Sequence, residues 1–278
     1  MTIDDNGLPA TFVPENKTII LIHGHRGSVG APFNTRIIQG KYKITKHKQL
    51  KHNIIVVDWG TEASYGYSVA SSYVVTVAND LASFLRWLAV QTSISTTTRE
   101  TSPTTTSTPP VPLVLMKELH LVGFGLGAHV AGIASRQLRN SPGLVGRITG
   151  LDPSGSGWGS RSQRLTADDA IYVEVIHTDG TGPLANGVGT AIGDIDFFAN
   201  GGSNQPGCYS HSCSHERAWE LFAASMRGHL VGYRCSSKTQ MNLNLCRGNP
   251  LAIGGTEVPK EARRYNIINR KRTNVNTN

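Results

Sequence analysis

The sequence has little charge, few cysteines and no long apolar run. Charged residues make up 17% of the 278 residues, which argues against global disorder, a long coiled coil or an ion-pair-rich surface. No stretch approaches the roughly 18 apolar residues of a membrane-spanning helix, so an integral membrane protein is excluded. The chain also lacks zinc-finger spacing, an aromatic RNA-binding motif and a long basic helix. Nucleic acid is therefore not expected as a partner, despite the net charge of +8.

The four cysteines lie in the last third of the chain, at Cys208, Cys213, Cys235 and Cys246. None forms a C-x-x-C pair, which argues against a structural zinc site or a thioredoxin-like motif. Of the three possible pairings, proximity in sequence favours Cys208–Cys213 and Cys235–Cys246. Disulfides indicate an oxidising compartment, so we expect a secreted, extracellular protein. Residues 1–10 are polar and contain no signal core, so we expect a removed signal segment or a truncated start.

Positive charge is concentrated in residues 41–52, which contain five Lys and two His. This stretch is typical of a solvated loop or helix face, and it also fits an anionic surface such as phospholipid headgroups.

Five short, nearly all-apolar runs predict buried β-strands, at residues 18–22, 53–57, 119–122, 148–151 and 171–176. Apolar residues at helical spacing predict helices over residues 74–88 and 126–138. Alternation of strands and helices indicates the α/β class, with a mostly parallel central sheet and helices on both faces.

A biased segment interrupts this pattern at residues 92–111. From Thr92 to Pro110, 16 of 19 residues are Thr, Ser or Pro, and such a stretch has few apolar side chains to offset its ordering entropy. It separates a predicted helix from a predicted strand. We therefore expect a disordered loop insertion within one domain spanning residues 1–278.

The segment from Gly123 to Gly127 lies between a predicted strand and a predicted helix, the setting of a nucleophile elbow. Asp152 follows the next strand, and His215 lies further along the chain. Nucleophile, Asp and His in this order are typical of α/β-hydrolases. The turn that contains His25 follows the first strand, where a second oxyanion-hole amide is expected.

Several motifs then match one family in order. They are Leu21-Ile22-His23-Gly24, Val56-Val57-Asp58-Trp59, Gly127-Ala128-His129-Val130-Ala131-Gly132, Gly146-Arg147-Ile148-Thr149-Gly150-Leu151-Asp152-Pro153, Val175-Ile176-His177-Thr178-Asp179-Gly180, Asn200-Gly201-Gly202, Gln205-Pro206-Gly207-Cys208 and Cys213-Ser214-His215. Over roughly residues 18–265 the chain resembles the pancreatic lipase and phospholipase A1 family, within the α/β-hydrolase superfamily.

The resemblance implies that Asp152 and His215 are two members of a catalytic triad. It also implies that the backbone amides of His25 and Leu126 form the oxyanion hole. The family's lid lies between the cysteines that match Cys208 and Cys213, and here only four residues separate them. The chain thus resembles insect and phospholipase A1-type members without a helical lid. We expect the Cys208–Cys213 disulfide to brace the loop that presents His215.

The main departure from the family is Gly125, which stands at the position of the nucleophilic Ser. A residue without a side-chain oxygen cannot form an acyl-enzyme. Phe124 also replaces the family's His. The pattern around Ser68 does not follow a strand directly and is a poor substitute nucleophile. His129 and His177 are expected to be structural.

Two further departures concern metal and fold. The family's calcium loop matches the segment around Asp169, but Thr166 replaces one of its carboxylates, so neither a metal nor another cofactor is expected. The first predicted strand starts near residue 18, so we expect the family's N-terminal edge strands to be missing. No C-terminal lipid-binding sandwich domain is expected either.

Three functions remain open from the sequence. The favoured one is a non-catalytic lipase-like protein that binds a lipid or phospholipid surface, or a protein partner. The second is an active triacylglycerol lipase or phospholipase A1 with a Ser-Asp-His triad. The third is a weak hydrolase in which His215 activates water directly.

Overall fold

The computed structural model describes residue 8 and residues 11–43, 52–90, 114–159, 163–228, 230–243, 245–254 and 273–277. The strands are β1 (Lys17–Ile22), β2 (His52–Val57), β3 (His120–Phe124), β4 (Arg147–Leu151), β5 (Tyr172–His177), β6 (Ile195–Ala199), β7 (Val231–Arg234), β8 (Pro250–Ala252) and β9 (Thr273–Thr277). The α-helices are α1 (Pro32–Lys43), α2 (Gly60–Ser64), α3 (Tyr67–Val90), α4 (Leu126–Gln137), α5 (His211–Ser225) and α6 (Lys238–Asn242). Short 3-10 helices are η2 (Met116–Glu118), η3 (Ala167–Asp169) and η4 (Asn200–Gly202).

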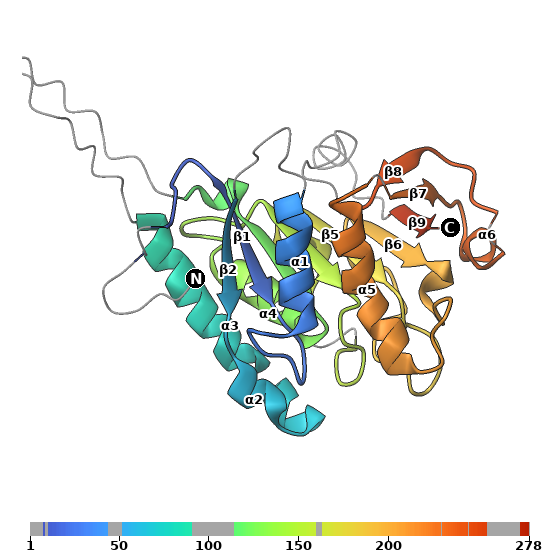
Figure 1. Cartoon of the computed structure of the whole chain (residues 1–278), viewed down its shortest axis with the longest axis horizontal. Coiled ribbons are helices and arrows are strands. Elements are labelled where there is room, and N and C mark those ends of the chain that lie inside the picture. Colours follow the sequence, from blue (N-terminus) through green and yellow to red (C-terminus); the bar gives the residue numbers. More distant parts are fainter. Residues whose placement is uncertain are drawn as a thin grey trace, which may run out of the picture.

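The strands form one sheet in the order β2-β1-β3-β4-β5-β6-β9-β7-β8 (Figure 1). The six strands from β2 to β6 are parallel, with Ile20 opposite Ile55 on one side and Leu121 on the other. The strand β9 adds in parallel to β6, whereas β7 and β8 pair antiparallel at the far edge. Because parallel strands end at the same edge, the loops after β1, β3, β4 and β5 meet there.

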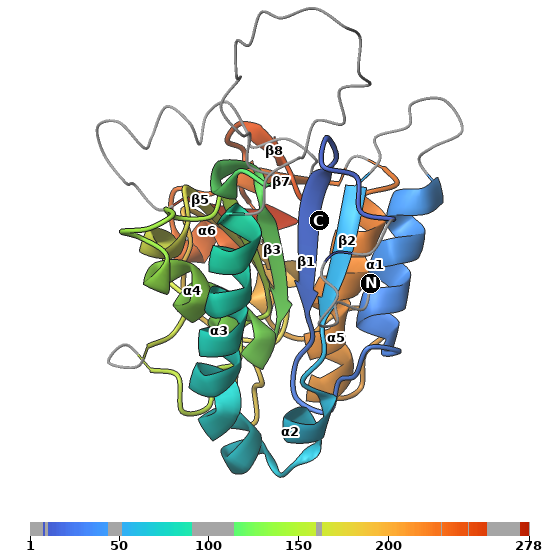
Figure 2. The same ribbon diagram turned by 90° about the vertical axis from the view of Figure 1, so that its left-hand side faces the viewer.

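Helices cover both faces of the sheet, as Figure 2 shows, with α3 and α4 on one side and α1 and α5 on the other. One apolar core lies under α3 and α4 and includes Leu81 and Leu85. A second lies under α1 and α5 and includes Ile37 and Phe222. Both faces are buried, which is why the strand sequences read as continuous apolar runs.

The α/β architecture expected from the sequence is confirmed, with a mostly parallel sheet between two helical layers. All five predicted strands are present within one or two residues of their expected ends. The helix α3 begins earlier than the predicted span of 74–88. Sequence periodicity did not predict α1, β6 or the three C-terminal strands.

Several expectations fall on residues that are not described. The predicted insertion at residues 92–111 lies wholly outside the described residues, as do residues 44–51 of the basic stretch. In the described part of the chain β1 is the first strand. Within those same residues, no helix is both long enough and apolar enough to cross a membrane.

Two disulfides are present, Cys208–Cys213 and Cys235–Cys246, the pairing that sequence proximity favours. The first disulfide encloses four residues and joins Cys208 to Cys213, which lies in the first turn of α5. One expectation here is wrong, because His215 lies on α5 itself and not on a loop. Ser210 caps that helix by accepting a hydrogen bond from the Cys213 backbone amide at 3.2 Å.

Candidate active site

The side chains of Asp152 and His215 meet at the edge where the parallel strands end. His215 Nδ1 and Asp152 Oδ2 are 2.6 Å apart. Asp152 directly follows β4, is fully buried and has a positive φ of 40°. Its other oxygen, Oδ1, accepts hydrogen bonds from the backbone amides of Thr178 at 2.9 Å and Asp179 at 3.2 Å. The carboxylate is therefore held by three donors, and it orients the imidazole of His215.

Gly125 occupies the turn between β3 and α4 with φ 56° and ψ −116°. Glycine adopts this conformation with little strain, whereas other residues do so at a cost. A Cβ atom built on Gly125 would lie 3.1 Å from His215 Nε2 and 3.4 Å from Ser154 Oγ. Residue 125 thus faces the free nitrogen of the imidazole, where a nucleophile would be needed, but it has no side chain.

Leu126 directly follows Gly125, and Gly24, the neighbour of His25, packs against the carbonyl oxygen of Phe124. In the described part of the chain, neither the His25 nor the Leu126 amide donates to a protein acceptor. The two chain segments that carry these amides are in close contact. Gly127 packs so tightly against the carbonyl oxygens of Ile22 and His23 that a side chain would not fit there. The Leu126 amide also opens α4, where the helix dipole favours negative charge. This arrangement can stabilise an oxyanion.

Phe124 packs against the imidazole of His215, with ring centroids 4.5 Å apart. On its other side Phe124 stacks on Phe33, at 5.9 Å. The ring that replaces the family's His therefore forms an apolar wall beside the dyad.

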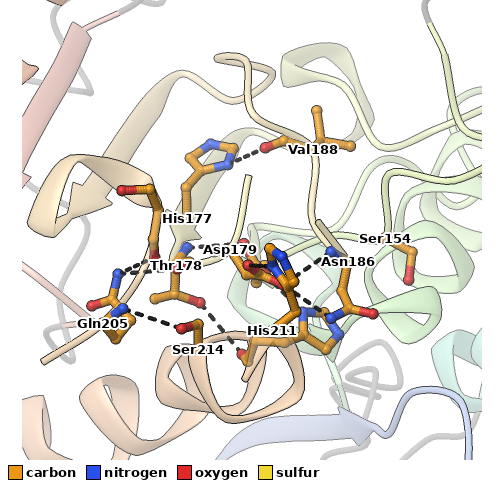
Figure 3. Close-up of polar contacts among 12 residues, drawn as sticks. Ser154, His177, Thr178, Asp179, Asn186, Val188, Gln205, His211 and Ser214 are labelled. Atoms are coloured by element: carbon orange, nitrogen blue, oxygen red, sulfur yellow. Dashed lines mark hydrogen bonds and ion pairs between the residues drawn. The ribbon is translucent and has the colours of Figure 1, made fainter. Parts of the chain in front are cut away.

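Figure 3 shows a second carboxylate–imidazole pair, formed by Asp179 and His211. It adjoins the dyad, because the Asp179 backbone amide donates to Asp152. His211 Nδ1 is 2.6 Å from Asp179 Oδ1, and Asp179 Oδ2 accepts from the backbone and side-chain nitrogens of Asn186, at 3.0 and 2.9 Å. His211 precedes His215 by one helical turn on α5, so both imidazoles lie on one side of that helix. This pair was not predicted, although the His-x-x-x-His spacing of His211 and His215 was a visible signal in the sequence.

Gln205 connects α5 to the loop after β5 (Figure 3). Its side-chain amide donates to the carbonyl oxygens of Thr178 at 3.0 Å and Ala199 at 2.8 Å, and its backbone amide donates to Ser214 Oγ at 3.1 Å. This network fixes the position of α5, and hence of His215, relative to Asp152.

His129 and His177 have packing roles, as expected. His129 is buried, and its ring nitrogens bond to the Ser154 carbonyl at 2.8 Å and the Leu165 amide at 3.1 Å. Burial lowers the pKa of His129 to about 4. The ring nitrogens of His177 are also both bonded, one of them to Asp196 at 2.8 Å. Neither imidazole is available to a substrate.

The segment that matches the calcium loop does not fit a metal ion. Arg136 holds both oxygens of Asp169, with two nitrogen–oxygen distances of 2.8 Å, and the Thr166 amide donates to the same carboxylate at 2.9 Å. A guanidinium thus fills the place of a cation. Among the described residues, no three His, Cys, Asp or Glu side chains are placed to share a metal ion.

The parallel sheet, the Asp–His dyad and the free amides define a site of the α/β-hydrolase type. Residues 5–98 and 113–251 match the family model described as Lipase. Lipoprotein lipase of Sus scrofa is 32% identical over 263 residues, and that of Homo sapiens is 31% identical; each match covers 84% of this chain. The chain belongs to the lipase family.

The chain spans about half the length of these relatives, 49% in each case. Among solved structures, a protein of the alpha/beta hydrolase superfamily from Xanthomonas campestris matches with a TM-score of 0.38 and 11% identity, covering 75% of this chain and 97% of that one. A lipase-esterase related protein from Clostridium acetobutylicum gives a TM-score of 0.27 and 13% identity, covering 51% and 44%. Both likenesses are too low to add to what the sheet itself shows.

Proposed function

We propose that this chain is a secreted, non-catalytic member of the lipase family that binds a lipid surface. The observation that carries the proposal is the glycine at position 125, facing His215 Nε2 where hydrolysis would require a nucleophilic oxygen. An intact Asp–His pair cannot form an acyl-enzyme without such an atom. The two disulfides support secretion, because they persist in oxidising compartments.

Exposed apolar side chains near the site support a lipid partner. Leu184 is 75% exposed and Tyr209 is fully exposed. A Cβ built on Gly182 would lie 3.9 Å from the imidazole of His211. The segment that contains Leu184 therefore lies beside the segment that contains Tyr209. On the oxyanion side, Tyr65 and Val69 are also exposed. Large exposed apolar residues grouped around a site are typical of interfaces with membranes or proteins.

The first test is labelling with a fluorophosphonate probe, which reacts with an activated Ser oxygen. The wild-type chain should remain unlabelled, and Gly125→Ser supplies a matched positive control. Stoichiometric labelling of any Ser in the wild type would overturn the proposal.

The second test measures fatty-acid release and co-sedimentation with phosphatidylcholine vesicles in one sample. We expect co-sedimentation without release. The double variant Leu184→Ser, Tyr209→Ser should bind vesicles at least about tenfold more weakly, since each side chain loses over 1 kcal/mol of burial. Val90→Ser is the matched control, because it changes an exposed apolar side chain at the far end of α3. At a helical rise of 1.5 Å per residue, Val90 lies about 35 Å from Tyr67, which begins that helix.

An active carboxylic-ester hydrolase, lipase or phospholipase A1, is the second candidate. It is favoured by the short His215–Asp152 hydrogen bond and by the two free amides, which together retain every part of the machinery except the nucleophile. Release of fatty acid by the wild type, lost in His215→Gln, would establish this alternative, including the form in which His215 activates water.

A further inference from the structure

The space beside Gly125 is bordered by polar groups. Because His215 Nδ1 already donates to Asp152, the other ring nitrogen, Nε2, donates into this space only when the imidazole is protonated. A Cβ at this position would lie 3.1 Å from His215 Nε2 and 3.4 Å from the hydroxyl of Ser154, which is almost fully buried. Across the described residues, His215 Nε2 has no protein partner. In a serine hydrolase the nucleophile's own side chain would fill this space.

Two backbone amides belong to the chain segments that adjoin this space, since Gly24 packs against the Phe124 carbonyl oxygen. The N–H groups of His25 and Leu126 have no acceptor in the described part of the chain, and the second of them begins the twelve-residue helix α4. The carboxylate of Asp152 lies behind the imidazole and accepts from three donors of its own. The two backbone amides beside Gly125 therefore lack an acceptor of negative charge.

We propose that this site binds the carboxylate of a free fatty acid. One carboxylate oxygen takes the place of the absent serine oxygen and accepts from Nε2 of the protonated His215 ring, beside the Ser154 hydroxyl, which also hydrogen-bonds to Tyr67. The other accepts from the amides of His25 and Leu126. The inference rests on the proposed function, since it requires that residue 125 forms no acyl-enzyme.

A carboxylate fits these donors better than an ester does. Hydrogen bonds to a charged acceptor are roughly twice as strong as neutral ones, and an anion also gains from the helix dipole. An acid that arrives protonated gives its proton to His215 Nε2, while Asp152 retains the hydrogen bond from Nδ1. The imidazolium and the carboxylate then form as a pair, and no proton is exchanged with the solvent.

The surroundings of the site suit an aliphatic chain. The ring of Phe124 lies against His215 at 4.5 Å. Exposed Leu184 and Tyr209 are each two residues along the chain from the contact between Gly182 and His211. A fatty acid would place its carboxylate among the donors and its chain along these apolar residues. The proposed ligand thus combines both properties of the site.

The test compares oleate with oleyl alcohol and methyl oleate, which have the same chain but no charge. Binding of each to the full chain is measured by displacement of a fluorescent fatty acid at constant pH. Oleate should bind at least about tenfold more tightly than oleyl alcohol, as expected for charge-assisted hydrogen bonds. Equal affinities would refute the carboxylate site.

Matched variants locate the binding. His215→Gln should weaken oleate binding by about tenfold and Ser154→Ala by a few-fold. His211→Gln makes the same change one helical turn away, at a ring that also bonds a carboxylate, and should leave oleate affinity unchanged. Gly125→Ser should weaken oleate binding because its hydroxymethyl group fills the space. If His215→Gln and His211→Gln have equal effects, the assignment of the carboxylate to His215 is wrong.

Failure of this inference and failure of the proposed function can be told apart. Hydrolysis of methyl oleate by the wild type would overturn the proposed function, whatever the affinity for oleate. Fluorophosphonate labelling at Ser154 would show that this hydroxyl acts as a displaced nucleophile, and would overturn both. Absence of labelling with equal affinity for acid and alcohol would overturn the carboxylate site alone.

Discussion

Two His–Asp pairs of similar geometry have different surroundings in this molecule. His177 lies 2.8 Å from Asp196, both side chains are fully buried, and the second ring nitrogen bonds to the Val188 carbonyl at 2.8 Å. His215 lies 2.6 Å from Asp152, its side chain is 16% exposed, and its second nitrogen faces Gly125. An imidazole with both nitrogens bonded serves the fold, whereas one with a single nitrogen held can serve a ligand.

The largest expected effect comes from breaking the buried pair. Asp196→Ala leaves the His177 ring and the backbone amides of Ile192 and Gly193 without their acceptor. We expect this to lower the free energy of unfolding by about 3–5 kcal/mol, the usual cost of removing one partner of a buried pair. Urea unfolding of the variant beside His215→Gln measures the difference. Equal loss in both variants would show that the two pairs do not differ as described.

A second expectation concerns the pH dependence of stability. The pKa of His129 falls from 6.5 to about 4 in the fold because the ring is buried. Between these values the unfolded chain binds a proton that the folded chain does not. The stabilising contribution is therefore complete above pH 6.5 and is lost as the pH falls to 4. The total is about 3 kcal/mol, at 1.36 kcal/mol per pKa unit.

The His129 contribution is isolated by measuring unfolding at several pH values in the wild type and in His129→Gln. The variant should show a smaller decrease between pH 6.5 and 4. Asp194 acts in the opposite sense, because burial raises its pKa to about 6 and its protonation on acidification favours the fold. Asp194→Asn should therefore steepen the acid loss. A wild-type slope unaffected by His129→Gln would contradict the assignment.

The smallest expected change in stability is that of Gly125→Ser, which also tests the open pair directly. At φ 56° a side chain is strained, so we expect a loss of about 1 kcal/mol, the low end of such costs. The new hydroxyl would lie beside His215, and activity on a short soluble ester should rise at least about tenfold over the parent. A melting curve and an ester assay decide it. If Gly125→Ser is more stable than the parent and equally inert, residues 123–127 do not form a nucleophile elbow.

The sequence predicted the central strands because each is buried on both faces and reads as an unbroken apolar run. It did not predict β6, whose second residue is Asp196. That carboxylate is offset by His177 of β5, a partner 19 residues away that no local pattern reveals. Short-range periodicity therefore fails where a long-range polar pair replaces an apolar residue.

The candidate site was predicted to a similar degree. Motif order predicted that Gly125, Asp152 and His215 lie together. Gly125 and Asp152 directly follow the strands β3 and β4 at the same sheet edge, and His215 reaches them from the second turn of α5. The role of Ser154 was not predicted. Its hydroxyl faces Gly125 only because the chain after β4 turns back beneath α4, where His129 bonds to the Ser154 carbonyl. Side-chain direction in such a turn depends on packing that the sequence does not encode locally.

The pairing of Arg136 with Asp169 has a consequence for how the protein responds when metal ions are removed from the solution. The stabilisation that a bound metal ion gives a fold rises with the logarithm of its free concentration, and it is lost when the solution is depleted of that ion. A guanidinium covalently attached to the same chain cannot diffuse away. We expect the melting temperature to be the same with and without a strong chelator. The positive charge that neutralises Asp169 is therefore present whatever metal ions the solution contains.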